Sequence, residues 1–299
     1  MKRKALFIIN PVSGGKKKDD VPDLIQKNLD TNLFEFTIVF TDSAMHGSQL
    51  AADAVGQYEY IVAVGGDGTV NEIASSIAGT DTVFGIIPFG SGNGLARFLG
   101  IPMDTEKAIR ALNDQHVEVI DAAKLNGQWF FNMAGMGFDA HISEVFSHDK
   151  TRGFGAYIRS AFREITNYKS ENYHIEIDGA VYEREAFMLS FANSSQYGNN
   201  AHVSPDASVQ DGLIDVCIIK PFPLYRFIEM GIRMFTKTST GSKYVEIIRG
   251  KNILVRRTKP APVHLDGEPQ ILGTEAEINV MPGSLRIVTG KILKNQMHN

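Results

Sequence analysis

Short apolar runs alternate with stretches of helical spacing over about the first 120 residues of this chain. The runs are four to seven residues long and rich in Ile and Val, which is typical of strands in a parallel sheet covered on both faces. The alternation predicts a doubly wound α/β layer, in which ligands bind at the carboxyl ends of the strands. We expect strands at residues 5–10, 34–40, 60–64 and 83–88 and helices at residues 21–29, 47–55 and 70–77.

The pattern changes after Asp121. Asn126-Gly127 lies between two short apolar runs and predicts a β-hairpin. One amphipathic helix is expected at residues 155–168, and strands are expected at residues 173–177, 181–185, 186–192, 213–220, 252–257 and 277–281. We therefore predict an α/β nucleotide-binding domain at residues 1–123 and a β-sandwich at residues 124–284, with the active site in the cleft between them. The tail, residues 285–299, is expected to return to the first domain.

Composition narrows the class of protein. The 299 residues carry a formal net charge of −4, which argues against nucleic acid as the main partner. Cys217 is the single cysteine and cannot form an intramolecular disulfide, which favours a reducing compartment. No apolar run reaches the roughly 18–20 residues that cross a bilayer, and the start of the chain is interpreted as a strand rather than a signal peptide. We expect a cytoplasmic protein without a transmembrane segment.

The segment Gly65-Gly66-Asp67-Gly68-Thr69 follows an apolar strand and opens a helix. Glycines let backbone N–H groups approach a ligand closely, and a helix N-terminus favours an anion. A carboxylate between glycines needs a partner such as a metal, a lysine or a hydroxyl group. Phosphate binding is the favoured interpretation, and the alternative is a tight turn in which Asp67 caps the helix.

Two other loops follow predicted strands in the same way. One contains Asn10-Pro11-Val12-Ser13-Gly14-Gly15-Lys16, and the other contains Pro88-Phe89-Gly90-Ser91-Gly92-Asn93-Gly94. Either loop alone could be an ordinary turn. In a parallel sheet all three loops would lie at one edge and could surround one nucleotide.

Several known signatures are missing. Gly15-Lys16 is followed by Lys17, so the chain has no Walker-type phosphate loop. The protein-kinase catalytic loop, the H-E-x-x-H helix and the G-x-S-x-G elbow do not occur, and the eight histidines show no metal-ligand spacing.

Taken together, the three glycine-containing loops resemble those of the diacylglycerol kinase catalytic-domain family, which includes bacterial soluble lipid kinases, sphingosine kinases and ceramide kinases. Asp211-Gly212-Leu213 and Asp266-Gly267-Glu268 follow in family order and spacing, so the resemblance covers nearly the whole chain. It implies an ATP- and Mg²⁺-dependent kinase that phosphorylates a primary hydroxyl of a lipid at a membrane surface. Peripheral membrane association and a homodimer are both compatible with it.

The resemblance also implies residue roles. Glu268 would be the general base, and Asp67 would lie beside the phosphates and Mg²⁺. Asp211, with the backbone carbonyls of Ser208 and Leu213, resembles a second, structural Mg²⁺ site, and Asp121 could join the water-mediated metal network. The residues implied to bind ATP are Asn10, Thr41, Gly65, Gly66, Asp67, Gly68, Thr69, Val70, Asn71, Glu72 and Ser91. Without the resemblance, Asp266-Gly267-Glu268 would be interpreted as a hairpin turn.

At one position this chain differs from many bacterial members of the diacylglycerol kinase family. They carry an acid where this chain has Gly94, so its Gly90–Gly94 segment is closer to the sphingosine-kinase version. This raises the prospect of a sphingoid base as substrate. Asp139 is then a candidate partner for the sphingoid ammonium group, and the alternative is a helix-capping residue.

Residues 222–235 form a mostly apolar helical pattern with one charged stripe. A helix buried in the second domain is the favoured interpretation, and contact with a membrane or a lipid entrance is the alternative. The run Lys16-Lys17-Lys18 could contact phosphate or anionic lipid, or could simply be solvated.

Two other functions are alternatives, and the first of them shares the Gly-Gly-Asp-Gly loop. One is a kinase of a soluble substrate, either NAD or a sugar phosphate, and it would act without micelles. The other is a non-catalytic nucleotide-binding regulator, which would bind ATP and form no product.

Overall fold

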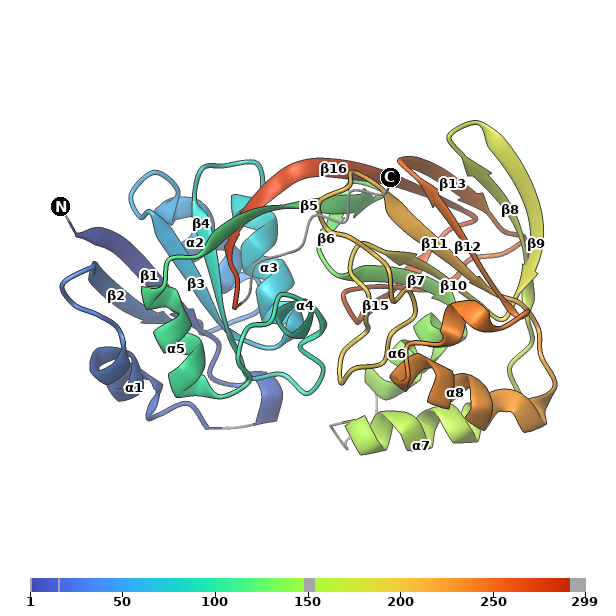
Figure 1. The fold of residues 1–299 in the computed structure, drawn as a ribbon, viewed down its shortest axis with the longest axis horizontal. Helices are drawn as coiled ribbons and strands as arrows, with labels where there is room; N and C mark the ends of the chain where they lie inside the picture. The colour runs from blue at the N-terminus through green and yellow to red at the C-terminus, as the bar shows by residue number, and fades with distance from the viewer. Residues whose placement is uncertain (1, 16, 148–153, 291–299) are drawn as a thin grey trace. The chain divides into compact units, whose positions relative to one another are not determined.

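The computed structural model describes residues 2–15, 17–147 and 154–290. The chain forms two compact units (Figure 1). The first comprises the described residues of Met1–Ile120 and Gly283–Asn299, and the second comprises those of Asp121–Pro282.

The first unit contains a parallel sheet in the order β2-β1-β3-β4, and the end of β16 pairs with β4 in the same direction. Its strands are β1 (Arg3–Ile9), β2 (Phe34–Phe40), β3 (Tyr60–Gly65), β4 (Val83–Pro88) and β16 (Glu275–Val288). All residues of β3 and β4 are buried, which agrees with the prediction of a sheet covered on both faces.

The helices of this unit form two groups. Its helices are α1 (Val21–Asn28), α2 (His46–Ala54), α3 (Asp67–Ile77), α4 (Gly94–Phe98) and α5 (Thr105–Asn113), with a short 3-10 turn at Ser13–Gly15. α1 packs beside α5, and α2 packs beside α3 (Figure 1). Connections between parallel strands are right-handed, and the chain reverses direction across the sheet after β2. The reversal puts α1 on one face and α2 and α3 on the other, as a doubly wound fold requires.

The second unit is a β-sandwich. One sheet is antiparallel with the order β12-β11-β10-β7-β14-β15, and the other contains β16-β13-β8-β9, with the β5-β6 hairpin beside β16. The strands are β5 (Val117–Leu125), β6 (Gln128–Phe130), β7 (Met133–Gly137), β8 (Glu171–Ile177), β9 (Ala180–Ala186), β10 (Met188–Ala192), β11 (Ile214–Ile219), β12 (Val245–Gly250), β13 (Asn252–Arg256), β14 (Ala261–Leu265) and β15 (Glu268–Leu272). Buried side chains of both sheets form one apolar core, so the sandwich prediction is confirmed.

The turn between β5 and β6 agrees with the predicted hairpin. Asn126 and Gly127 have φ values of 46° and 81°, and two successive positive φ values match the right-handed twist of the flanking strands.

Three helices cover the outer face of the β10-containing sheet: α6 (Phe138–Ser147), α7 (Phe154–Glu164) and α8 (Phe227–Phe235). On α8, Met230 is buried, and Phe227 and Met234 pack against buried clusters. Ile228 and Ile232 are exposed. The expectation of a buried helix at residues 222–235 therefore holds for only one side of α8. Within the described residues, no helix combines the length and apolarity needed to cross a membrane.

Candidate functional site

Polar and glycine residues gather at the carboxyl edge of the parallel sheet in the first unit. The strand order reverses between β1 and β3, so this point is the topological switch of the sheet, where α/β folds bind ligands. Asn10 follows β1, and Gly66 follows β3. The backbone N–H of Asn10 donates to the carbonyl of Val64 at 3.1 Å, which joins the two strand ends directly.

Asn10 also joins its loop to the start of α3. Its side-chain Nδ2 donates to Oγ1 of Thr69 at 3.0 Å. The buried Thr69 side chain lies so close to Gly65 that a Cβ on this glycine would be 2.5 Å from Cβ of Thr69. Glycine at position 65 therefore lets α3 begin directly above the end of β3. The helix begins at Asp67, three residues before the sequence-based prediction.

The other glycine loops approach this one through their backbones. A Cβ on Gly66 would lie 3.1 Å from Cα of Gly90, and a Cβ on Gly90 would lie 2.8 Å from Cα of Gly66. Gly14 has a φ of +70°, and a Cβ on it would lie 1.8 Å from the carbonyl oxygen of Phe89. Side chains at these three positions would push the loops apart. The backbones of the three loops thus lie in close contact at these glycines.

Asp67 links two of the loops. Its Oδ2 accepts the N–H of Asn93 at 2.9 Å, and its Oδ1 accepts the N–H of Gly94 at 3.0 Å. Asn93 precedes α4 in a left-handed conformation, with a φ of 50°. The carboxylate therefore binds the N-terminus of α4, whereas its own helix α3 has no side-chain cap. The capping alternative considered from the sequence is partly right, although the capped helix is a different one.

The other residues implied to bind ATP have varied surroundings. Thr41 is buried at the end of β2, and its N–H donates to the carbonyl of Ile9 at 2.9 Å. Val70 is buried on α3, and Ser91 is exposed. Oε1 of Glu72 accepts the N–H of Ser48 at 3.0 Å, so this side chain ties α3 to the start of α2. Oδ1 of Asn71 accepts from Oγ of Ser75 at 3.3 Å.

Lys18 behaves differently from a solvated lysine. Its Nζ donates to the carbonyl of Ser13 at 2.5 Å and lies 5.0 Å from the centre of the Phe89 ring. Burial lowers the pKa of Lys18 below its usual value. Lys18 therefore fastens the first loop to the third, whereas Lys17 is exposed and residue 16 lies outside the described residues.

The Asp-Gly-Glu segment of the second unit forms the turn between β14 and β15. Asp266 and Gly267 have φ values of 48° and 93°, which is the hairpin geometry that Asp-Gly favours. The Asp266 carboxylate accepts three backbone N–H groups, each at 2.9 Å, from Phe131, Asn132 and Met133. Glu268 is exposed, and among the described residues its carboxylate has no hydrogen-bond or ion-pair partner. The turn is therefore fixed by Asp266, and Glu268 extends from it.

Asp121 and Asp211 come together in the second unit. Oδ2 of Asp121 accepts the N–H of Gly212 at 2.8 Å, and Oδ1 of Asp211 accepts the N–H of Leu213 at 3.1 Å. Burial raises the pKa of Asp211, and the neighbouring Asp215 and Asp121 charges raise it further. A divalent cation would relieve this repulsion, and oxygen ligands suit Mg²⁺. Within the described part of the chain, however, no three His, Cys, Asp or Glu side chains converge on a metal-sized site.

Asp139 is already occupied by protein donors. Its Oδ2 lies 2.7 Å from the Tyr197 hydroxyl, 3.1 Å from Nε2 of His264 and 3.3 Å from Oγ of Ser190, and its Oδ1 accepts the N–H of Ala140 at 2.8 Å. A carboxylate has about four acceptor positions, so these contacts account for its capacity. These contacts favour a structural role for Asp139, and its role as a partner for a sphingoid ammonium group stays a prediction. The sequence did not indicate this network, because its members come from four separate segments.

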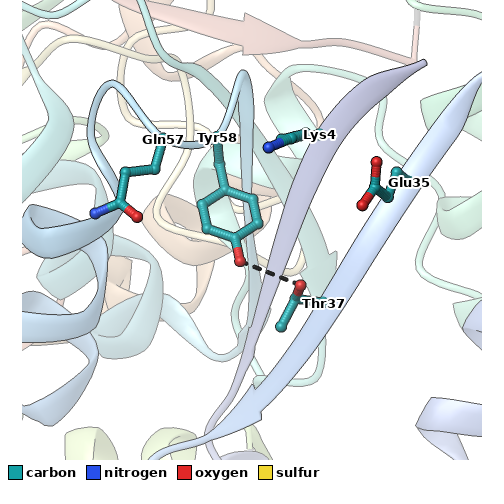
Figure 2. A pocket seen from close by; sticks show the side chains of 5 residues that line it. All are labelled: Lys4, Glu35, Thr37, Gln57 and Tyr58. Atoms are coloured by element: carbon teal, nitrogen blue, oxygen red, sulfur yellow. Dashed lines mark hydrogen bonds between the residues drawn. The ribbon is translucent and has the colours of Figure 1, made fainter. Parts of the chain in front are cut away.

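A pocket in the first unit lies far from this edge. It is lined by Lys4, Glu35, Thr37, Gln57 and Tyr58, toward the amino ends of β1 and β3 (Figure 2). The Tyr58 hydroxyl donates to Oγ1 of Thr37 at 3.1 Å across it. Ligands of parallel α/β sheets bind at the opposite end of the strands, so we assign no function to this pocket.

Two family models match this chain. The family model of the diacylglycerol kinase catalytic domain matches residues 4–125, and that of the YegS C-terminal NAD kinase beta sandwich-like domain matches residues 132–289. A diacylglycerol kinase of Staphylococcus saprophyticus is 30% identical over 278 residues, which cover 90% of each chain. A protein of Pseudomonas aeruginosa named "Probable lipid kinase YegS-like" is 32% identical and covers 77% of this chain and 76% of its own.

The same likeness extends to solved structures. A crystal structure of a diacylglycerol kinase from Bacillus anthracis strain Sterne has a TM-score of 0.75 and is 23% identical. The match covers 96% of this chain and 97% of that one. At this identity the likeness establishes a shared fold.

Proposed function

Since this chain belongs to the family of diacylglycerol kinases and YegS-like lipid kinases, we propose that it transfers the γ-phosphate of ATP to a primary hydroxyl of a membrane-derived lipid. Diacylglycerol is the first candidate substrate, because relatives named diacylglycerol kinase match 90% of the chain.

The observation that carries the proposal is the close approach of the Gly66 and Gly90 backbones, together with the hydrogen bond from Asn10 to Thr69. These contacts leave the first turn of α3 directly behind a surface made of backbone rather than side chains. The first N–H groups of a helix have no partner within the helix, and the helix dipole adds positive potential there. Such a surface favours a phosphate chain.

Phosphoryl transfer depends mainly on positioning and on neutralising charge. In the proposed reaction Glu268 accepts the proton of the lipid hydroxyl as that oxygen attacks the γ-phosphorus of ATP. The bond between this phosphorus and the β,γ-bridging oxygen breaks, and ADP leaves. An exposed carboxylate on a turn fixed by Asp266 suits this role, because the backbone that carries it is held by three hydrogen bonds. Asp67 would act at the phosphate site by holding the Asn93–Gly94 backbone in place.

Mg²⁺ would supply charge neutralisation at the phosphates when it is bound. Asp67 is the first-unit carboxylate proposed to act near it. Asp211, with the carbonyl oxygens of Ser208 and Leu213, would hold a second, structural Mg²⁺, and Asp121 would contribute through water. Burial raises the pKa of Asp211, and the Asp215 and Asp121 charges raise it further; a bound cation would offset both effects, which supports this second site.

Two observations keep other substrates as candidates beside diacylglycerol. Gly94 stands where many bacterial members have an acid, which keeps a sphingoid base as a second lipid candidate. The second domain matches the family described as the YegS C-terminal NAD kinase beta sandwich-like domain, and the likeness to NAD kinase in that description keeps a soluble nucleotide substrate as an alternative.

The test is a direct assay of the purified full chain. It is incubated with ATP labelled at the γ-phosphate, Mg²⁺, and either mixed micelles of dioleoylglycerol, mixed micelles of sphingosine, or NAD without detergent. We expect labelled product in the organic extract with dioleoylglycerol and its loss with EDTA. Labelled NADP alone would replace the lipid-kinase proposal with the soluble one. ATP binding without any product would favour the regulator.

A further inference from the structure

The sequence of helix α8 gives it three different faces. Phe227, Met230 and Met234 recur at positions that share one side of a helix, and this side packs on the second unit. Arg226, Glu229 and Arg233 share another side. The third side carries large apolar side chains that are exposed, and it continues into the 3-10 turn Leu224–Arg226. Its members are Leu224, Tyr225, Ile228, Ile232 and Phe235. We call these five residues the α8 outer face.

The exposure of this face is high for large apolar side chains. The exposed fractions are 52% for Leu224, 78% for Tyr225, 61% for Ile228, 57% for Ile232 and 44% for Phe235. Single exposed apolar residues are ordinary, but a contiguous row of them on one helix marks an interaction surface. The row is also held rigidly, because the opposite side of the helix is anchored in the apolar clusters.

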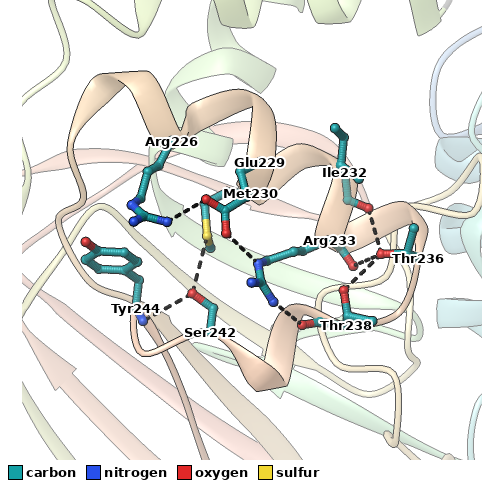
Figure 3. Close-up of polar contacts among 9 residues, drawn as sticks. All are labelled: Arg226, Glu229, Met230, Ile232, Arg233, Thr236, Thr238, Ser242 and Tyr244. Atoms are coloured by element: carbon teal, nitrogen blue, oxygen red, sulfur yellow. Dashed lines mark hydrogen bonds and ion pairs between the residues drawn. The ribbon is translucent and has the colours of Figure 1, made fainter.

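The charged side of α8 is mainly basic. Glu229 accepts from Nη1 of Arg226 at 2.6 Å and from Nε of Arg233 at 2.9 Å, so one carboxylate is shared between two guanidinium groups (Figure 3). Lys237 and Lys243 follow the helix and are exposed. Residues 221–244 thus carry four basic groups and one acidic group in a chain whose net charge is −4.

We propose that the α8 outer face docks on the surface of an anionic lipid bilayer. An interfacial helix needs an apolar side that enters the boundary between headgroups and acyl chains and basic groups that meet anionic headgroups. The outer face supplies the first, and Arg226, Arg233, Lys237 and Lys243 supply the second. Tyr225, the most exposed member, has an aromatic ring with a polar tip, which suits the headgroup level.

A second copy of the chain fits this surface less well. In a two-fold dimer the same face would meet itself, so the basic groups of both copies would be brought together. A bilayer that contains anionic lipid provides opposite charge instead. The inference deepens the proposed function and rests on it in one respect, because a bilayer is where such a lipid substrate resides.

The binding test needs neither ATP nor turnover. The full chain is sedimented with vesicles of phosphatidylcholine alone or of phosphatidylcholine with phosphatidylglycerol. We expect the wild type to bind the anionic vesicles. We expect the double variant Ile228→Gln/Ile232→Gln to bind them at least about tenfold more weakly, because two exposed isoleucine side chains no longer transfer into the bilayer. The matched control is Val181→Gln on β9, whose exposed fraction of 56% is similar, and it should bind as the wild type does.

The charge component has its own test. The variant Lys237→Gln/Lys243→Gln should lose binding to anionic vesicles and become less sensitive to salt, while any weak binding to neutral vesicles stays the same. Equal binding of the wild type and the isoleucine variant to anionic vesicles would overturn the proposal. A concentration-dependent dimer that disappears in the isoleucine variant, with no vesicle binding, would assign this face to a second copy instead.

Activity separates this proposal from the proposed function. With a short-chain diacylglycerol dissolved as monomers, the isoleucine variant should turn over at the wild-type rate; with diacylglycerol in anionic vesicles, it should be slower by a factor similar to its loss of binding. If the wild type shows vesicle binding but no lipid phosphorylation, the kinase proposal fails and the docking surface stands. Loss of turnover on the monomeric substrate would overturn the assignment of α8 to docking.

Discussion

The Asp67 carboxylate accepts the backbone N–H of Asn93 at 2.9 Å, although the two residues lie in different glycine loops. Asn93 adopts a left-handed conformation that asparagine tolerates, and its own Nδ2 donates to the carbonyl of Gly90 at 2.7 Å. The acid between the glycines therefore holds together the two loops proposed to bind phosphate. Its importance for activity and its importance for local structure have to be measured separately.

Asp67→Ala should reduce both stability and ATP binding. The substitution leaves two partly buried N–H groups without their acceptor, which costs about 1–3 kcal/mol of unfolding free energy. Urea unfolding and ATP titration measure the two effects. Asp67→Asn keeps one acceptor oxygen and should lose less stability, and Asp81→Ala, an exposed acid of the same unit, is the control. Unchanged stability of Asp67→Ala would contradict the bridging role.

Glu268→Gln should abolish phosphoryl transfer and leave stability unchanged. The side chain is exposed and has no polar partner among the described residues, so only its proton-accepting capacity is lost. Steady-state kinetics with micellar lipid and thermal unfolding test this. Glu185→Gln, an exposed glutamate on β9, should keep full activity. A Glu268→Gln enzyme with near wild-type turnover would show that another group is the base.

Asp139→Ala should destabilise the second unit strongly. Tyr197, His264 and Ser190 would lose a buried acceptor, and such losses cost about 2–4 kcal/mol. Burial raises the pKa of Tyr197 well above its usual value, and the Asp139 charge raises it further, so this tyrosine remains a donor at neutral pH. Chemical denaturation provides the measurement. A normally stable Asp139→Ala protein that lost only sphingosine turnover would favour the ammonium-binding interpretation instead.

Asp211→Asn should remove the Mg²⁺ dependence of stability. We expect the melting temperature of the wild type to rise as Mg²⁺ is added, because a ligand of the native state stabilises it, and we expect no such rise in the variant. Without Mg²⁺ the variant should be at least as stable as the wild type, because the raised pKa of Asp211 reflects an unfavourable charge. Asp206→Asn, an exposed acid of the same segment, should respond to Mg²⁺ normally. An equal Mg²⁺ response in Asp211→Asn would exclude this residue as a ligand.

Glu246 should contribute stability that depends on pH. Hydrogen bonds from Arg184, and then from Lys220, lower the pKa of Glu246 from 4.5 to about 2, against the opposing effect of burial. Because its pKa is lower in the folded state, the contribution is complete above about pH 4.5 and is lost as the pH falls towards 2. Glu246→Gln should therefore be about 0.5–1 kcal/mol less stable at pH 7. Thermal unfolding from pH 7 to pH 2 should show this difference closing, and a difference that stayed constant would contradict the assignment.

In the first unit the sequence indicated strands β1 to β4 and helices α1 to α3, and it did not indicate α4 or α5. The strands expected at residues 34–40 and 83–88 have those bounds in the structure, because both are short runs of aromatic and aliphatic residues with high β propensity. It determined less of the second unit. Strands β7, β14 and β15 were not expected, since Met133–Gly137 is rich in glycine and Ala261–Leu265 contains a proline and a histidine. Their pairing with distant strands compensates for these weak local preferences.

The local sequence also indicated the positions of the glycine loops and of the candidate acidic residues, because the geometry of a short backbone segment depends on its neighbouring residues. It could not show that Asp67 binds the N–H groups of residues 26 and 27 positions away, or that Asp139 meets His264 across 125 positions. Nor could it show which side of α8 is exposed, because helical periodicity separates apolar from charged faces but does not say which apolar face has a partner. Such contacts depend on which segments the folded chain brings together, and only the tertiary structure decides that.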